Sequence, residues 1–145
     1  MSESLNNSNN TPVIKCESVY KIFGNNASKL LENSNGQVDA KTFQEAGCIV
    51  GVNNASFGVN KGEMMVVMGL SGSGKSTLLR CISKLTDATA GKIFIDGEDL
   101  LAMSNKQLIE LRRNKMGMVF QSFALLPHKT VIENIAFPLQ IKGTN

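Results

Sequence analysis

The sequence at residues 69–77 reads Gly69, Leu70, Ser71, Gly72, Ser73, Gly74, Lys75, Ser76 and Thr77. It fits the phosphate-loop pattern, in which a glycine is followed by four residues, a second glycine, a lysine and a serine or threonine. A triphosphate needs backbone N–H donors curled around it, and glycines allow the backbone angles that such a curl demands. We interpret the stretch as a binding site for a nucleoside triphosphate.

Two side chains of this loop are expected to supply charge and metal coordination. Lys75 adds a positive charge, and hydrogen bonds to a charged group are worth roughly 1.5 to 3 kcal/mol. The dipole of a helix that begins near Lys75 contributes roughly 0.3 to 2 kcal/mol, so the lysine should matter more. The Ser76 hydroxyl is placed to bind a Mg²⁺ that bridges the outer phosphates and arrives with the nucleotide.

The flanking sequence has the pattern that a phosphate loop requires. Residues 64–68 are a continuous apolar run, too short for a helix and consistent with a strand buried on both faces. After the loop, one side of a helical wheel collects Leu78, Leu79, Cys81, Ile82 and Leu85. An accidental match in a flexible Gly/Ser loop has a chance on the order of one per cent at average residue usage.

Composition bounds the remaining possibilities. The chain has 145 residues, 42% of them hydrophobic, which suits one globular domain. Its net charge of +3 comes from basic residues that are scattered except at 112–115, so we expect no nucleic-acid partner.

Cys16, Cys48 and Cys81 lack metal-ligand spacing and are interpreted as reduced thiols. There is no signal-peptide pattern and no apolar run long enough to span a bilayer, which predicts a soluble chain.

The first half of the chain predicts strands around an insertion. Residues 1–12 are rich in Ser and Asn and are expected to be a disordered tail. The patterns at 13–23 and 51–59 predict two strands, the first bending near Glu17. The polar stretch 25–50 between them is interpreted as an insertion in a hairpin connection, with short helices around 29–32 and 38–46. A further strand is predicted at 92–95, closed by an Asp-Gly turn at 96–97.

Two capping boxes predict helices in the last third of the chain. A Ser-x-x-Gln box at 104–107 predicts a helix that runs to about residue 113. A Thr-x-x-Glu box at 130–133 predicts a short helix that Pro138 must end or kink.

Between these helices, residues 116–120 are interpreted as another buried strand, which leads into Gln121. The side-chain oxygen of Gln121 could reach Mg²⁺ and an attacking water, and would move if the following loop moved. From the residues alone, an exposed loop glutamine is the alternative interpretation.

With the phosphate loop and the Gln121 segment taken together, the sequence resembles the ATP-binding cassette subunits of transporters. Residues 69–77 are similar to that family's phosphate loop, and Val119-Phe120-Gln121 is similar to its glutamine loop. A closer resemblance, to importers of glycine betaine, proline and related quaternary amines, is carried by residues 20–24, 51–52, 68–70 and 120–128. The resemblance implies an α/β fold, a P-loop NTPase cassette core with an antiparallel β subdomain. Residues 13–145 would be the N-terminal part of that domain.

The resemblance also assigns roles to residues. It implies that Phe23 stacks on adenine, that Lys75 contacts the β- and γ-phosphates, and that Ser76 and Gln121 reach Mg²⁺. Lys75 and Gln121 are the expected catalytic residues. Taken alone, Phe23 could be a core aromatic. Residues 123–138 are implied to face a membrane subunit, although their apolar loop could equally pack internally.

The implied function is ATP binding and, in the complete protein, ATP hydrolysis that drives import of glycine betaine, proline or a related compatible solute. The implied partners are a second cassette subunit, a membrane permease and, indirectly, a substrate-binding protein. The implied location is peripheral, at the cytoplasmic face of the plasma membrane.

Three parts of the family pattern have no match in the sequence: the signature segment, the acidic strand that supplies a Mg²⁺ ligand and a base, and the switch histidine. We therefore expect a longer protein, and expect this chain alone to be incomplete for hydrolysis. Two alternatives stay open. One is a soluble cassette ATPase of repair or translation, and the other is a truncated module that binds nucleotide without hydrolysing it.

Overall fold

The computed structural model describes residues 11–120 and 125–143. These residues divide into two compact units, one ending at Ser104 and one beginning at Asn105. Among the described residues, the first unit carries the strands and the helices α1 to α3, and the second carries α4 and α5. Most of the predicted N-terminal tail, and Gln121, lie outside the described residues.

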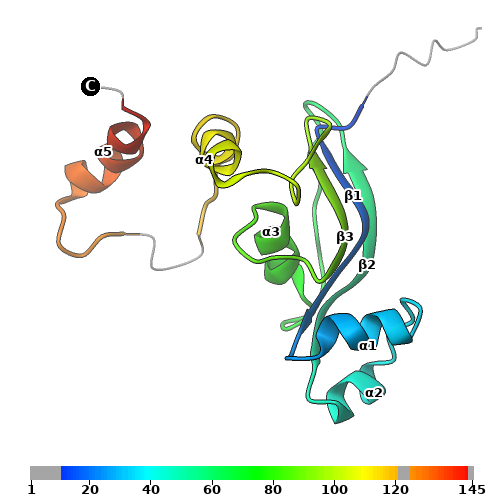
Figure 1. Cartoon of the computed structure of the whole chain (residues 1–145). Coiled ribbons are helices and arrows are strands. Elements are labelled where there is room, and N and C mark those ends of the chain that lie inside the picture. The colour runs from blue at the N-terminus through cyan, green and yellow to red at the C-terminus, as the bar shows by residue number, and fades with distance from the viewer. Residues whose placement is uncertain (1–10, 121–124, 144–145) are drawn as a thin grey trace, which may run out of the picture. The chain divides into compact units, whose positions relative to one another are not determined.

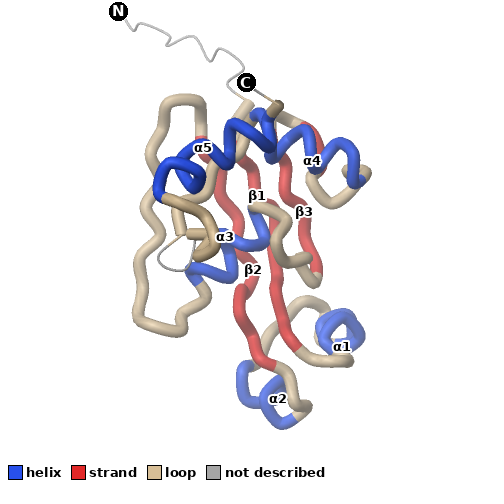
Figure 2. The backbone as a smooth tube through the Cα atoms, turned by 90° about the vertical axis from the view of Figure 1, so that its left-hand side faces the viewer, coloured by secondary structure: helices blue, strands red, loops and turns tan. Residues whose placement is uncertain are grey.

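The first unit is built on a four-stranded antiparallel sheet in the order β2-β1-β3-β4 (Figure 1, Figure 2). Its strands are β1 (Ile14–Phe23), β2 (Ile49–Val59), β3 (Ala90–Ile95) and β4 (Glu98–Asp99). Valine, isoleucine and aromatic residues recur in the three long strands, and these residues favour a half-buried pleated surface. The strands predicted at 13–23, 51–59 and 92–95 are confirmed.

An irregularity interrupts β1 in its first half. Ser18 has a φ of 47°, and the register of β1 against β2 shifts between Cys16 and Val19. The Ser18 N–H donates to the Ser56 hydroxyl oxygen at 2.8 Å rather than to a carbonyl of the ladder. The bend predicted near Glu17 is therefore confirmed.

The connection from β1 to β2 contains α1 (Ala27–Asn33) and α2 (Ala40–Glu45), which lie at one end of the sheet (Figure 2). This insertion has its own core, formed by the buried residues Tyr20, Ile22, Ala27, Leu31, Phe43 and Cys48. Asp39 caps α2, accepting a hydrogen bond from the Thr42 N–H at 2.9 Å. The prediction of a hairpin connection with two helical pieces is confirmed.

Phe43 is 1% exposed and anchors this insertion core. We expect Phe43→Ala to destabilise the insertion by about 3–5 kcal/mol, because a deleted phenylalanine leaves a cavity that the surroundings fill only in part. The measurement is limited proteolysis with mass spectrometry, which should find faster cleavage between residues 25 and 47. Phe57→Ala, in the half-buried part of β2, should not speed cleavage there. Unchanged cleavage in Phe43→Ala would contradict the anchoring role.

The helix α3 (Lys75–Ile82) lies against the sheet and contacts β1 and β2 (Figure 1). Leu78 and Cys81 are buried on its inner side, as the apolar pattern predicts. The helix is shorter than that pattern suggests, since it ends at Ile82, and Leu79 and Leu85 are each 52% exposed.

Two predicted strands are wrong. Residues 64–68 and 116–120, all of which the structure describes, form no strand and are largely exposed, with Met64 at 88% and Val119 at 100%. A strand in the interior of a parallel sheet needs hydrogen-bond partners on both edges and cover on both faces. The strands of the described residues pair only among themselves, so neither apolar run finds a neighbouring strand.

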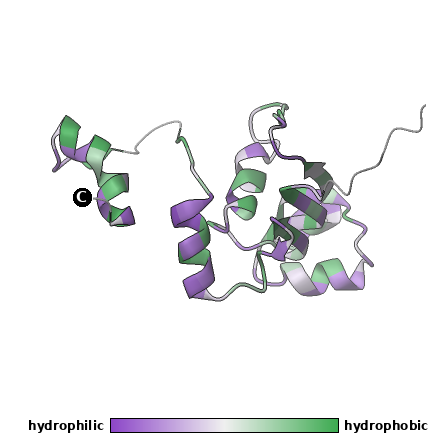
Figure 3. Cartoon of the chain, turned by 90° about the horizontal axis from the view of Figure 1, so that it is seen from above, coloured by the Kyte–Doolittle hydropathy of each residue, from purple (hydrophilic) through white to green (hydrophobic). Residues whose placement is uncertain are grey.

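The second unit contains α4 (Asn105–Asn114) and α5 (Val131–Lys142). Both predicted helices are confirmed, and Thr130 and Glu133 form the predicted capping box. Pro138 lies inside α5 and does not end it, which corrects one of the two predicted outcomes. Hydrophobic residues occur along the length of α5 (Figure 3), and none of its side chains is buried. Among the residues that the structure describes, no helix is long and apolar enough to cross a bilayer.

Candidate functional site

The phosphate loop leads directly into α3. Gly74 precedes the helix with a left-handed φ of 91°, and Lys75 is the first helical residue. The N–H groups of a first helical turn have no partner within the helix, and they point toward the loop together with the positive end of the helix dipole. The loop therefore ends in a set of donors suited to an anion.

The Lys75 ammonium lies inside the curl of the loop. Its Nζ donates to the carbonyl oxygens of Gly69 at 2.8 Å and Leu70 at 2.6 Å, and lies 3.3 Å from the Ser73 hydroxyl oxygen. Carbonyl oxygens are neutral acceptors, whereas a phosphate oxygen adds a negative charge that attracts the ammonium by Coulomb interaction. Lys75 is thus held at a place where phosphate oxygens can replace these acceptors at a gain in free energy.

The loop is seated on β2 through a contact between two backbones. A Cβ added at Gly74 would lie 1.8 Å from the carbonyl oxygen of Gly51 in β2. No side chain fits into that gap, and the left-handed φ of Gly74 also favours glycine. A glycine at position 74 therefore lets the phosphate loop approach the sheet this closely.

Gly51 also leaves room for Phe23. A Cβ added at Gly51 would meet Phe23 Cε2 at 2.9 Å and Thr77 Cγ2 at 3.0 Å, so the aromatic ring and the first turn of α3 converge on one point. Phe23 is 43% exposed, and the Lys21 ammonium lies 4.9 Å from the centroid of its ring, within cation–π range. Phe23 is therefore not a core aromatic, and the alternative interpretation of this residue is wrong.

A cavity of about 420 Å³ opens between β2 and the phosphate loop. Its walls come from β2, residues 67–69, residues 73–75 and Leu78. Small-molecule sites usually occupy roughly 300–1,000 Å³ and combine apolar walls with a few polar groups. Val50 and Val52 supply apolar walls here, and Lys75 supplies the charge.

The side-chain oxygens near the loop suit a metal ion that arrives already bound to a phosphate ligand. Ser76 lies exposed in the first turn of α3 and offers one hydroxyl oxygen. Within residues 11–120 and 125–143, no three His, Cys, Asp or Glu residues cluster to hold a metal ion. Mg²⁺ is commonly held by one or two protein oxygens together with waters and substrate phosphates, and Ser76 fits that mode. The second predicted ligand, Gln121, lies outside the described residues.

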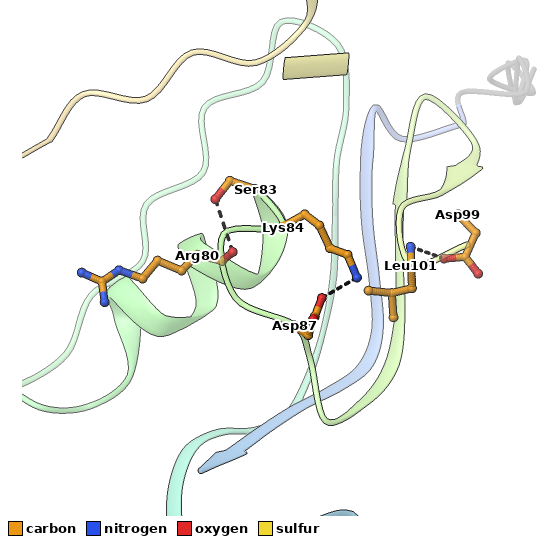
Figure 4. A network of polar contacts seen from close by, with 6 residues as sticks. All are labelled: Arg80, Ser83, Lys84, Asp87, Asp99 and Leu101. Carbon is orange, nitrogen blue, oxygen red and sulfur yellow. Dashed lines mark hydrogen bonds and ion pairs between the residues drawn. The ribbon is translucent and has the colours of Figure 1, made fainter. Parts of the chain in front are cut away.

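A polar network closes the far end of α3 (Figure 4). The Lys84 ammonium pairs with the Asp87 carboxylate at 2.5 Å, and its hydrogen bond lowers the pKa of that carboxyl. The Ser83 hydroxyl donates to the Arg80 carbonyl oxygen at 3.3 Å. These contacts hold the chain as it leaves the helix toward β3.

Burial disfavours the reactive thiolate form of Cys16 and Cys81. Cys16, Cys48 and Cys81 are free thiols in the interior. Burial, with a contribution from the neighbouring Cys81, raises the pKa of Cys16 to about 11. Burial also raises the pKa of Cys81. Since the thiolate is the reactive form, both side chains act as small apolar groups in this fold.

The loop, its lysine and the helix that follows define the phosphate-loop class of nucleotide-binding proteins. Within this class, the family model described as ABC transporter matches residues 52–144, and the chain belongs to that family. The predicted cassette fold with an antiparallel β subdomain is thereby confirmed, and the family is one of ATPases.

Curated relatives share most of this chain. The trimethylamine N-oxide transport system ATP-binding protein TmoW of Pelagibacter ubique is 84% identical over 132 residues, which are 91% of this chain and 39% of that protein. The glycine betaine transport ATP-binding protein OpuAA of Bacillus subtilis is 48% identical over 133 residues, 91% of this chain and 32% of that protein. The chain therefore matches 32% to 39% of the length of these relatives.

Solved structures agree with the fold. The dimeric structure of MJ0796, a bacterial ABC transporter cassette, aligns with a TM-score of 0.69 and 32% identity over 89% of this chain and 47% of that chain. A dimeric post-hydrolysis state of the same cassette, bound to ADP and Pi, aligns with the same TM-score and 31% identity.

Sequence reasoning did not identify Gly51 or Lys21 as neighbours of the site. Gly51 reaches it through contacts with Phe23 of β1 and Thr77 of α3, which are far apart in the sequence, and Lys21 reaches it through Phe23, two residues further along β1. No local pattern marks such contacts. In the sequence, these contacts are indicated only by where a glycine and a lysine stand in two strands that pair with each other.

Proposed function

We propose that this chain binds ATP with residues 69–77 and that the whole protein hydrolyses the ATP to drive solute import through a membrane permease. The observation that carries this proposal is the position of Lys75, whose Nζ lies in the curl of the loop at 2.8 Å and 2.6 Å from two replaceable carbonyl acceptors. Phosphoryl transfer depends on positioning and charge neutralisation, and this loop supplies both for the triphosphate.

Each residue of the site has a separate role in this proposal. The backbone N–H groups of the loop and of the first turn of α3 surround the β-phosphate, and Lys75 neutralises the β- and γ-phosphates. Ser76 holds the Mg²⁺ that the nucleotide brings, with Gln121 as its second protein ligand. Phe23 stacks on the adenine, since its exposed ring lies against the start of α3.

The solute we propose carries a trimethylated nitrogen, and trimethylamine N-oxide is the first candidate. The relative at 84% identity is named for trimethylamine N-oxide transport, whereas relatives named for glycine betaine transport are 43% to 48% identical. Glycine betaine, which the sequence resemblance implied, is the second candidate.

The assembly we propose is that of an importer. A second cassette subunit completes the ATP site, a permease spans the membrane, and a substrate-binding protein delivers the solute. The solved dimers of MJ0796 support a pair of cassettes. The chain would then lie peripherally at the cytoplasmic face of the membrane.

Uptake of labelled solute tests this proposal. Cells that lack the gene should lose uptake of trimethylamine N-oxide, the wild-type gene should restore it, and a Lys75→Ala gene should not. Unimpaired uptake of both trimethylamine N-oxide and glycine betaine in the deletion strain would contradict the transport assignment. Loss of glycine betaine uptake alone would contradict only the choice of solute.

A further inference from the structure

We propose that Thr89 is a positioning residue that fixes the Phe23 ring at the distance from the phosphate loop that a nucleotide requires. This inference rests on the proposed ATP binding and adds to it the element that sets the spacing between the base and the triphosphate. The hydrogen bonds of Thr89 go to Tyr20 and Ile22 of β1, so its effect on the ring is transmitted through this strand.

Thr89 holds the last residues of β1 with three hydrogen bonds. Its N–H donates to the Tyr20 carbonyl oxygen at 2.7 Å. Its hydroxyl accepts from the Ile22 N–H at 2.9 Å and donates to the Ile22 carbonyl oxygen at 3.1 Å. The backbone pairing of β1 with β3 ends at Tyr20 and Ala90, so the threonine side chain continues the ladder by one step. The next residue along β1 is Phe23.

The other end of the same connection is tied to α3. The N–H groups of Leu85 and Thr86 donate to the Arg80 carbonyl oxygen at 2.9 Å and 3.1 Å. The ion pair between Lys84 and Asp87 closes this segment (Figure 4). Residues 83–89 therefore form a short bridge between the helix that begins at the phosphate loop and the strand that ends at Phe23.

The ring is bounded on its other side by Gly51. A methyl group at Gly51 would come within 2.9 Å of Phe23 Cε2, and the ring edge is the part that can move. The position of the ring thus depends on two contacts outside the loop: the hold of Thr89 on Ile22, and the space at Gly51. The hold of Thr89 on Ile22 can be removed without touching a residue of the phosphate loop, whereas a methyl group at Gly51 would also meet Thr77 Cγ2 at 3.0 Å.

The substitution Thr89→Val keeps the shape of the side chain and removes both hydroxyl hydrogen bonds. The N–H and carbonyl of Ile22 lose their partners, and a part-buried backbone without partners is held less firmly. We expect the ring to lose its fixed position, which weakens stacking on the base and leaves the phosphate contacts intact.

The experiment compares two ligands by titration calorimetry of the full chain with Mg²⁺: ATP, and inorganic tripolyphosphate, which has no base. Phe23→Ala should bind ATP about tenfold more weakly, because stacking of a base on an aromatic side chain is commonly worth that much. Thr89→Val should bind ATP about three- to tenfold more weakly, within the same limit. Neither should change tripolyphosphate binding. Thr89→Ser, which keeps the hydroxyl, should restore ATP binding.

A double substitution separates positioning from general stability. If Thr89 acts through the ring, Phe23→Ala combined with Thr89→Val should bind ATP no more weakly than Phe23→Ala alone. Thr89→Ala removes the same hydroxyl and places no new group in the site, so it gives a second variant that does not depend on Thr89→Val folding well. It should also weaken ATP binding and leave tripolyphosphate binding unchanged.

Three results would overturn the inference. Equal losses for ATP and tripolyphosphate in Thr89→Val would make Thr89 a structural residue only. Unchanged ATP binding in both Thr89→Val and Thr89→Ala would show that the ring position does not depend on the Thr89 hydroxyl. A wild-type chain that binds neither ligand would overturn the proposed function together with this inference.

Discussion

Lys75→Ala is expected to weaken ATP binding by about ten- to a hundredfold, because charge-assisted hydrogen bonds to phosphate are worth roughly 1.5 to 3 kcal/mol and every 1.4 kcal/mol is tenfold. The same change should reduce ATP turnover to background in the full-length protein. It removes the charge that the structure holds within the loop, 2.8 Å and 2.6 Å from the carbonyl oxygens of Gly69 and Leu70. Isothermal titration with ATP and a phosphate-release assay measure the two effects.

The stability of the chain should change little in this variant. The carbonyl oxygens that Lys75 contacts belong to exposed loop residues, so water can replace the ammonium. Lys61→Ala is a matched control, since Lys61 is an exposed lysine in a turn of the same unit. It should bind ATP as the wild type does. Wild-type ATP binding in Lys75→Ala would show that Lys75 does not contact the phosphates.

Gly74→Ala is expected to have the largest effect on the site, because it separates the phosphate loop from the sheet. The new Cβ would lie 1.8 Å from the Gly51 carbonyl oxygen, and the left-handed φ of 91° adds strain. Left-handed strain of about 1–2 kcal/mol and overpacking of about 1–3 kcal/mol together predict a loss of roughly 3 kcal/mol in stability. The midpoint of thermal unfolding should fall by roughly 10 °C, and ATP binding should be lost.

Gly62→Ala is the control that isolates the contact from the backbone strain. Gly62 has a left-handed φ of 79°, close to that of Gly74, but a Cβ there would meet nothing within 4 Å. This variant should lose only about 1–2 kcal/mol and keep its affinity for ATP. Similar thermal shifts in the two variants, with ATP binding kept in both, would show that the contact with Gly51 does not position the loop.

The elements that could be predicted from the sequence are those whose signal is local. The antiparallel strands were marked by β-branched and aromatic residues, α5 by its Thr-x-x-Glu capping box, and the phosphate loop by its glycine spacing. The connection between β1 and β2 was also predicted, because its polar composition separates two apolar strands that pair with each other, although β2 begins at Ile49 rather than after residue 50.

The prediction failed for two apolar runs whose folding into strands depends on other strands far away in the sequence. Residues 64–68 have the composition of a buried parallel strand, yet they are exposed because no strand of the described residues lies beside them. Residues 116–120 differ from the prediction for the same reason. The composition of a segment indicates which structures it can form. A strand joins a sheet only where a neighbouring strand provides partners for its backbone hydrogen bonds.

By itself, the sequence determined that this protein carries a phosphate loop followed by a helix, because that motif is a matter of residue types at fixed local spacing. Only the tertiary structure decided what surrounds the loop. Gly51 of β2 meets Gly74 of the loop, Phe23 lies against Gly51, and Thr89 holds the end of β1. Each of these contacts joins residues far apart in the chain, where pairing of strands and packing of α3 on the sheet, rather than local preference, set the distances.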